Sequence, residues 1–110
     1  MSYIKIKNLN KINAELTNYC NAACPMCARY SIDGILNKEI VNTMHTSLAL
    51  IKEKIGIDVI KRLQNFTSCG NLGDGAMNPE CLEIYKWLRQ TNPTLGLNLH
   101  TNGGARTPEF

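Results

Sequence analysis

Strand-like and helix-like hydrophobic patterns alternate along this chain, and their order constrains the fold more than any other feature. Apolar and polar residues alternate over residues 11–17 and again over residues 95–100, which predicts a strand at each place. A short run over residues 66–71 opens onto a glycine-rich loop and predicts a strand between them. Apolar residues at helical spacing fill both intervals. Strand, helix, strand, helix, strand is the order of an α/β fold with a parallel sheet.

The two predicted helices have recognisable ends. The first follows residues 30–46, which we expect to be mostly loop, and is interrupted near Gly56. The second has Asn78 at its cap position and Pro79 in its first turn, and it stops before Pro93. We expect its buried stripe to consist of Leu82, Tyr85 and Leu88, with Ile84 and Trp87 beside them.

The composition excludes several classes of protein. With 44% hydrophobic and 19% charged residues, the 110-residue chain has the balance of one globular domain. Twelve Lys and Arg against nine Asp and Glu give a net charge of +3, which is too small for a dedicated nucleic-acid binder. Residues 1–13 lack the apolar core of a signal peptide, and no stretch approaches the ~18 continuous apolar residues of a transmembrane helix. We therefore expect a soluble, cytoplasmic protein without a membrane partner.

Five cysteines are many for so short a chain. Their odd number and the lack of a secretory signal argue against a disulfide scaffold, and clustered thiols in a reducing compartment are typical of metal ligands. Cys20, Cys24 and Cys27 lie within eight residues, whereas Cys69 and Cys81 stand alone and are expected to be small buried side chains. Cys69 lies near the glycine-rich loop, so an approach to the metal site is the alternative for this residue. Cubane iron–sulfur clusters usually take four thiolates, so a loop with three either borrows a distant fourth ligand or leaves one iron open.

Three segments together resemble a known family. The cysteine loop, which follows the first predicted strand, is similar to the CxxxCxxC signature of radical S-adenosylmethionine enzymes. Residues 72–75 resemble the family's GGEP loop, with Asp for Glu and Gly for Pro, and residues 100–103 resemble its TNG turn. All three follow the carboxyl ends of successive predicted strands, where parallel α/β folds assemble their sites. The resemblance covers residues 14–104 and is closest to members with a cysteine-rich or shortened accessory domain of the SPASM or twitch type.

The resemblance implies an iron–sulfur cluster and a radical reaction. Cys20, Cys24 and Cys27 would hold three irons of a [4Fe-4S] cluster, and the amino and carboxylate groups of S-adenosylmethionine would chelate the fourth. One electron, from a donor such as flavodoxin or ferredoxin, would break a carbon–sulfur bond of the sulfonium homolytically. The resulting 5'-deoxyadenosyl radical would take a hydrogen atom from a peptide or small-molecule substrate, which the sequence does not identify.

The same resemblance assigns the residues that bind S-adenosylmethionine. Gly73 and Asp74 would offer backbone carbonyls to its methionine amino group, which requires close approach of the main chain and few side chains. Met26 would lie against the adenine. Thr101 and Asn102 would contact the methionine moiety or the ribose.

The fold implied by the resemblance is a partial parallel (β/α) barrel of the radical S-adenosylmethionine type. Each strand-plus-helix step takes roughly 30 residues, so residues 1–110 are expected to supply the first three strands and two helices of the core domain, its amino-terminal portion. Thr107 and Pro108 predict the start of a further helix. Polar faces on two strands, ending in Thr17 and His100, fit either a partly open barrel around a polar cofactor or an edge that faces solvent.

Two other functions remain open from the sequence. Cys20, Cys24 and Cys27 with His45 or His100 would make a Cys3His structural zinc site in a small interaction module without catalysis. Alternatively, a degenerate relative of the family would keep the loops and work with a partner chain. Outside a zinc site, both histidines are expected to face solvent or to form hydrogen bonds.

Overall fold

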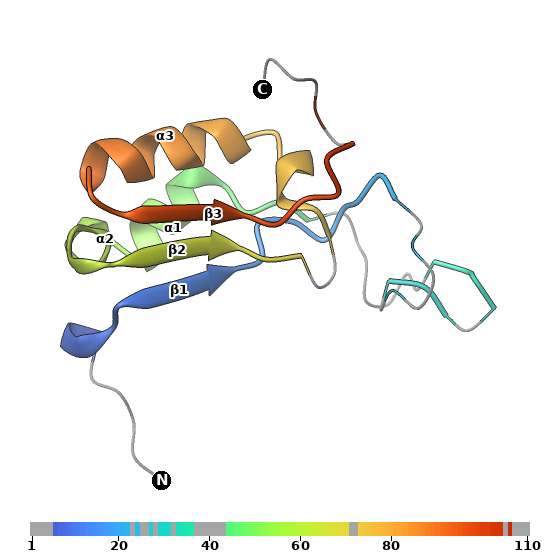
Figure 1. Cartoon of the computed structure of the whole chain (residues 1–110), viewed down its shortest axis with the longest axis horizontal. Coiled ribbons are helices and arrows are strands. Elements are labelled where there is room, and N and C mark those ends of the chain that lie inside the picture. Colours follow the sequence, from blue (N-terminus) through green and yellow to red (C-terminus); the bar gives the residue numbers. More distant parts are fainter. Residues whose placement is uncertain are drawn as a thin grey trace, which may run out of the picture.

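The computed structural model describes residues 6–22, 24, 27, 29–31, 33–36, 44–70, 73–104 and 106. These residues form a three-stranded sheet and three α-helices, which confirms the α/β prediction (Figure 1). Within the described part of the chain, every helix falls short of the length and hydrophobicity needed to cross a membrane. In chain order the elements are the 3-10 helix η1 (Ile6–Asn8), β1 (Lys11–Ala14), α1 (Leu48–Lys54), α2 (Ile57–Arg62), β2 (Asn65–Ser68), the 3-10 helix η2 (Gly75–Met77), α3 (Cys81–Thr91) and β3 (Gly96–Leu99).

The sheet is parallel throughout, with β2 between β1 and β3. Ile12, Phe66 and Leu97 stand opposite one another in its register. Parallel strands need crossover connections, and α1 with α2 supplies the first and α3 the second. The predicted order of strands and helices is therefore confirmed, and the carboxyl ends of all three strands meet at one edge of the sheet (Figure 1).

β1 ends earlier than the alternating pattern predicted. Its pairing with β2 stops at Ala14, and Thr17 instead forms an antiparallel bridge with His45. The Thr46 amide donates a hydrogen bond of 2.9 Å to the Leu16 carbonyl in the same pairing. The chain beyond β1 thus pairs with a different segment, and a period-two pattern carries no information about which partner a strand will take.

Gly56 divides the first predicted helix into α1 and α2. Its φ angle of 85° lies in the left-handed region that favours glycine, so the interruption predicted there is confirmed. In the described residues of the segment 30–46, Tyr30 and Leu36 form an isolated antiparallel bridge and no helix occurs, which agrees with the predicted loop. The predicted helix start at Thr107 and Pro108 lies outside the described residues.

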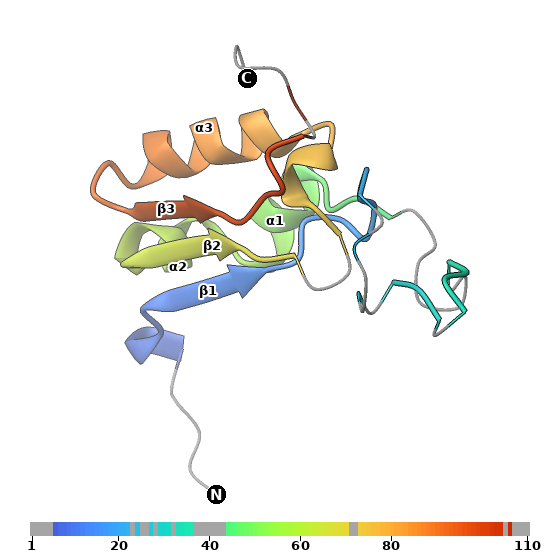
Figure 2. The ribbon, with the colours of Figure 1, turned by 45° about the vertical axis from the view of Figure 1, so that its right-hand side comes forward.

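The three helices gather on one face of the sheet, and the core lies between the two layers (Figures 1 and 2). Phe66 of β2, Ile60 of α2 and Leu88 of α3 are completely buried in it. Strand residues alternate in direction, so Asn13 and Asn98 point to the other face, where both are exposed. The face that carries polar strand residues is therefore the one turned away from the helices.

The buried stripe of α3 differs from the predicted one. Cys81, Ile84 and Leu88 are buried, whereas Leu82 is 36% exposed and Tyr85 is partly buried. The prediction was wrong at Leu82. The predicted stripe and the buried one both have helical spacing, and the orientation of α3 on the sheet decides which of the two is buried. The expectation that Cys81 is a small buried side chain is confirmed.

A buried asparagine joins the start of α3 to the chain that follows β1. The Nδ2 of Asn78 donates to the Leu16 carbonyl at 2.7 Å and to the Thr46 carbonyl at 2.8 Å. Its Oδ1 accepts from the Glu80 amide at 2.9 Å, and α3 begins at Cys81, later than the predicted cap position implied. Asn78 therefore fixes the segment leading to the cysteines against the helix layer.

Candidate functional site

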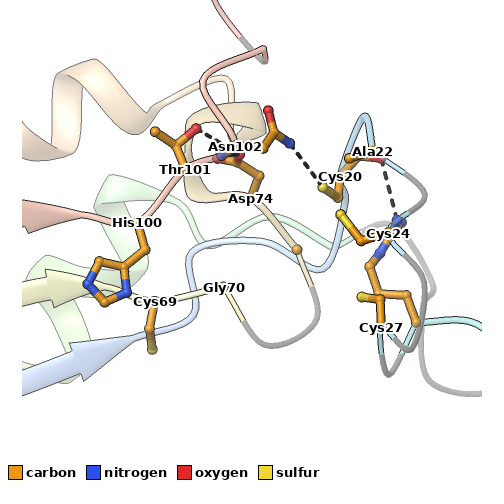
Figure 3. Close-up of a pocket in the computed structure, with 12 residues that line it drawn as sticks. Cys20, Ala22, Cys24, Cys27, Cys69, Gly70, Asp74, His100, Thr101 and Asn102 are labelled. Atoms are coloured by element: carbon orange, nitrogen blue, oxygen red, sulfur yellow. Dashed lines mark hydrogen bonds between the residues drawn. The ribbon is translucent and has the colours of Figure 1, made fainter.

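A cavity of about 350 Å³ lies beyond the carboxyl ends of the strands (Figure 3). Apart from Arg29, its lining residues come from three segments, which we name the cysteine loop (residues 20–27), the glycine loop (residues 69–75) and the third-strand turn (residues 100–104). Each segment follows one strand of the parallel sheet. The cavity is lined by Cys20, Ala22, Cys24, Cys27, Arg29, Cys69, Gly70, Gly73, Asp74, His100, Thr101 and Asn102.

These lining residues include all the predicted site residues except Met26, which lies outside the described part of the chain. Cys20, Cys24 and Cys27 are free thiols; Cys24 is exposed, and the other two are partly buried. Backbone hydrogen bonds shape the loop from within, since the Cys27 amide donates to the Cys24 carbonyl and the Tyr30 amide to the Cys27 carbonyl. The structure thus brings the three thiols to one cavity.

Gly73 packs directly against the backbone of residues 17–19, which lead into the cysteine loop. A Cβ atom at this position would lie 2.5 Å from the Thr17 carbonyl oxygen and 2.8 Å from the Tyr19 nitrogen, so any side chain would collide with backbone. The neighbouring Asp74 amide donates to the Tyr19 carbonyl at 2.9 Å. The glycine at this position therefore permits the glycine loop to contact the segment that leads into the cysteine loop.

The Asp74 carboxylate connects the glycine loop to the third-strand turn. The residue is 4% exposed, and Oδ1 accepts from the Ala76 amide at 3.0 Å. Its Oδ2 accepts from the Thr101 hydroxyl at 2.7 Å and from the Asn102 amide at 2.8 Å (Figure 3). The sequence assigned a role to the backbone carbonyl of Asp74, and it did not anticipate this use of the side chain.

Asn102 fastens the third-strand turn to the cysteine loop. Its Nδ2 donates to the Asn21 Oδ1 at 2.8 Å and to the Cys20 Sγ at 3.5 Å, and its Oδ1 accepts from the Gly104 amide at 2.7 Å. The side-chain amide, expected to contact the methionine or the ribose, is thus in contact with one of the predicted cluster ligands (Figure 3).

Cys69 and His100 line the cavity from the ends of β2 and β3. The Cys69 amide donates to the Ala14 carbonyl and the His100 amide to the Ser68 carbonyl, both at 3.0 Å, so each continues the parallel ladder by one residue. Cys69 is only partly buried and lines the cavity, so the structure agrees with the alternative expectation that it lies near the site, and not with that of a fully buried side chain. His100 is exposed, as expected, but it also faces the cysteine cavity.

His45 belongs to a different part of the surface. Its Nδ1 lies 2.7 Å from the Thr17 hydroxyl oxygen, and its ring meets that of Tyr19 edge-on. It lines a second cavity, of about 210 Å³, together with Glu15 and Leu50 among others. The expectation that His45 forms a hydrogen bond is confirmed, and His45 is not among the residues that line the cysteine cavity.

Arg29 is a site residue that the sequence analysis missed. It lines the cysteine cavity although it is 4% exposed, and its Nη1 donates to the Cys20 carbonyl at 3.5 Å. The signal available in the sequence was a lone charged residue two positions after Cys27, in a loop otherwise poor in charge. The place of Arg29 in the sequence does not indicate that its charge is buried.

The lining thiols are of a type that binds either a zinc ion or an iron–sulfur cluster. A zinc ion needs its ligands to converge on one point, whereas each thiolate of a cubane cluster binds a different iron. Among the described residues, no group of three or more His, Cys, Asp and Glu side chains is arranged to hold one metal ion.

Comparisons of the chain with models of protein families, with curated proteins and with solved structures find no match.

Proposed function

We propose that this protein is a radical S-adenosylmethionine enzyme that holds a [4Fe-4S] cluster through Cys20, Cys24 and Cys27. One observation carries the proposal: the cysteine loop, the glycine loop and the third-strand turn line a single cavity at the carboxyl edge of a parallel sheet. These are the three segments whose sequences resemble the motifs of that family. Loops that follow successive parallel strands lie at one end of the sheet in any case; the support comes from the agreement that the three segments with family-like sequences are the three that line the cavity there.

The residues that line the cavity would hold the cluster and S-adenosylmethionine at a fixed distance from each other. When bound, the cluster and S-adenosylmethionine supply one-electron cleavage of the sulfonium and a 5'-deoxyadenosyl radical that abstracts hydrogen from a peptide or small-molecule substrate. Asp74 ties the glycine loop to the third-strand turn, and Asn102 ties that turn to the cysteine loop. The three walls are therefore linked by side chains, which suits a site that must hold a cofactor in one orientation.

The proposal extends to the partner and the compartment. Reduction of the cluster requires a one-electron donor, such as flavodoxin or ferredoxin. Three free thiols that must stay reduced before the cluster assembles favour a cytoplasmic location.

A structural zinc site is the rival function; Figure 3 shows His100 beside Cys69, across the cavity from the cysteine loop. His100 lines the same cavity as Cys20, Cys24 and Cys27, so these four side chains provide the chemistry of a Cys3His site. The described geometry shows no convergence of three such ligands on one ion, which weighs against a preformed zinc site. The two functions differ in the metal that the protein binds, and the bound metal can be measured directly.

Anaerobic reconstitution with ferrous iron and sulfide separates the two functions. We expect a brown, air-sensitive protein that contains iron and sulfide; a colourless protein with stoichiometric zinc would support the rival. Cys24→Ala should abolish cluster assembly, and full iron content in this variant would refute the proposal. Cys69→Ser is the matched control, because Cys69 lines the same cavity but lies outside the cysteine loop.

The same control tests whether one iron is open. Cys69→Ser should retain its iron, and S-adenosylmethionine should change the electron paramagnetic resonance spectrum of the reduced cluster. Loss of the cluster in Cys69→Ser would identify Cys69 as a fourth ligand. A cluster with four thiolates has no iron open to the cofactor, so that result would contradict the proposed function.

A further inference from the structure

Arg29 is a buried cation without an anionic partner in the described residues. Its side chain is 4% exposed and lines the cysteine cavity, and its Nε is buried without a hydrogen-bond partner. The contacts of the guanidinium are a long hydrogen bond, 3.5 Å, to the Cys20 carbonyl and a position 5.6 Å from the centre of the Tyr30 ring. Among the described residues, no carboxylate forms an ion pair with Arg29.

Asp74, the acidic residue that lines the same cavity, does not fill this role. Its two oxygens accept three hydrogen bonds, from Ala76, Thr101 and Asn102. A guanidinium stays protonated in proteins, and a charge removed from water is strongly destabilising unless an anion or a full set of hydrogen bonds compensates it. The position of Arg29 is therefore explained if the cavity binds an anion beside it.

We propose that Arg29 is the counter-charge of the iron–sulfur cluster ligated by Cys20, Cys24 and Cys27, an inference that rests on the proposed function. Three thiolates outweigh the positive charge of the oxidised cluster core, so the ligated cluster is an anion. Reduction by one electron from an external donor makes it more negative. A fixed guanidinium on the same cavity wall stabilises the reduced form more than the oxidised form, and so raises the reduction potential.

If Arg29 has this role, its charge destabilises the protein without the cluster and stabilises it when the cluster is bound. Without the cluster, the unpaired charge of Arg29 opposes folding, so an apolar side chain of similar length should be tolerated. With the cluster bound, the same substitution removes a favourable charge interaction. A purely structural arginine, which packs its stem against the loop, would instead lose stability in both states.

The first experiment measures urea denaturation of the cluster-free chain. Arg29→Met should unfold at the same urea concentration as the wild type or at a higher one. Arg62→Met, on the exposed surface of α2, is the matched control and should leave the midpoint unchanged. A clear decrease in the midpoint for Arg29→Met alone would overturn the inference.

The second experiment compares the reconstituted, cluster-loaded variants by potentiometry and by iron loss to a chelator. Arg29→Met should lower the reduction potential and lose iron about tenfold faster, as expected for the loss of one favourable charge interaction with the cluster. Arg29→Lys, which keeps the charge, should recover much of the wild-type potential, and Arg62→Met should match the wild type.

The outcomes separate this inference from the proposed function. A wild-type chain that assembles no cluster would refute both. A wild-type chain with a cluster, together with an unchanged potential in Arg29→Met, would refute the inference alone. If Arg29→Met kept its potential but bound S-adenosylmethionine less tightly, Arg29 would be assigned to the cofactor carboxylate and the inference would again be overturned.

Discussion

Replacing Asp74 by alanine tests whether one carboxylate holds two walls of the cavity together. The substitution removes three hydrogen bonds from a side chain that is 4% exposed. Hydrogen bonds to a charged acceptor contribute about 1.5–3 kcal/mol each. Thr101 and Asn102 are exposed, so water can replace the carboxylate at two donors, whereas the amide of buried Ala76 stays unsatisfied. We therefore expect Asp74→Ala to lower the free energy of unfolding by about 2–4 kcal/mol.

Urea denaturation followed by far-ultraviolet circular dichroism measures this loss, and amide hydrogen exchange measures its location. Exchange at Asn102 should accelerate in Asp74→Ala more than exchange in α3. Asp58→Ala is the control, because Asp58 is an exposed acid in the first turn of α2 and should cost less than about 1 kcal/mol. If the two alanine variants were equally stable and the Asn102 amide kept its exchange rate, the reasoning would be refuted.

Three further predictions concern the framework of the site. Asn78→Ala should lower the free energy of unfolding by about 2–4 kcal/mol, since it removes the side-chain donor of the Thr46 carbonyl and one of the two donors of the Leu16 carbonyl; a loss below about 1 kcal/mol in urea denaturation would contradict this. Burial raises the pKa of Tyr85 from 10.0 to about 12. The unfolded chain then loses this proton first, so stability should fall by at most about 2 kcal/mol between pH 10 and 12, and Tyr85→Phe should abolish that component. Gly73→Ala should reduce both stability and iron content after reconstitution, because its Cβ would meet backbone at 2.5 Å; unchanged iron content would show that this close contact is not needed.

Local pattern was sufficient to predict the elements of this fold. The period-two and helical spacings are properties of neighbouring residues, so they identified the strands, the helices and the interruption at Gly56 without knowledge of the rest of the chain. The parallel order then placed three loops at one edge of the sheet, because each strand must run in the same direction. The shared cavity of the cysteine loop, the glycine loop and the third-strand turn follows from that order.

Details that depend on distant partners were not predictable. β1 stops at Ala14 because the following residues pair with the segment around His45, about 28 positions away. The exposed position of Leu82 depends on how α3 rotates against the sheet. In both cases the local sequence is compatible with more than one set of contacts, and residues distant in the chain decide which set forms.

The amino-acid sequence alone determined which chemical groups this chain brings to its carboxyl edge: three thiols, a glycine loop with one aspartate, and a threonine–asparagine turn. The tertiary structure alone decided how those groups are used. Asp74 became a tie between two loops, Cys69 reached the cavity wall, and Arg29 was buried beside the thiols. The physical reason is that hydrogen bonding and burial depend on groups far apart in the chain, which come together only after the strands have paired and the helices have packed.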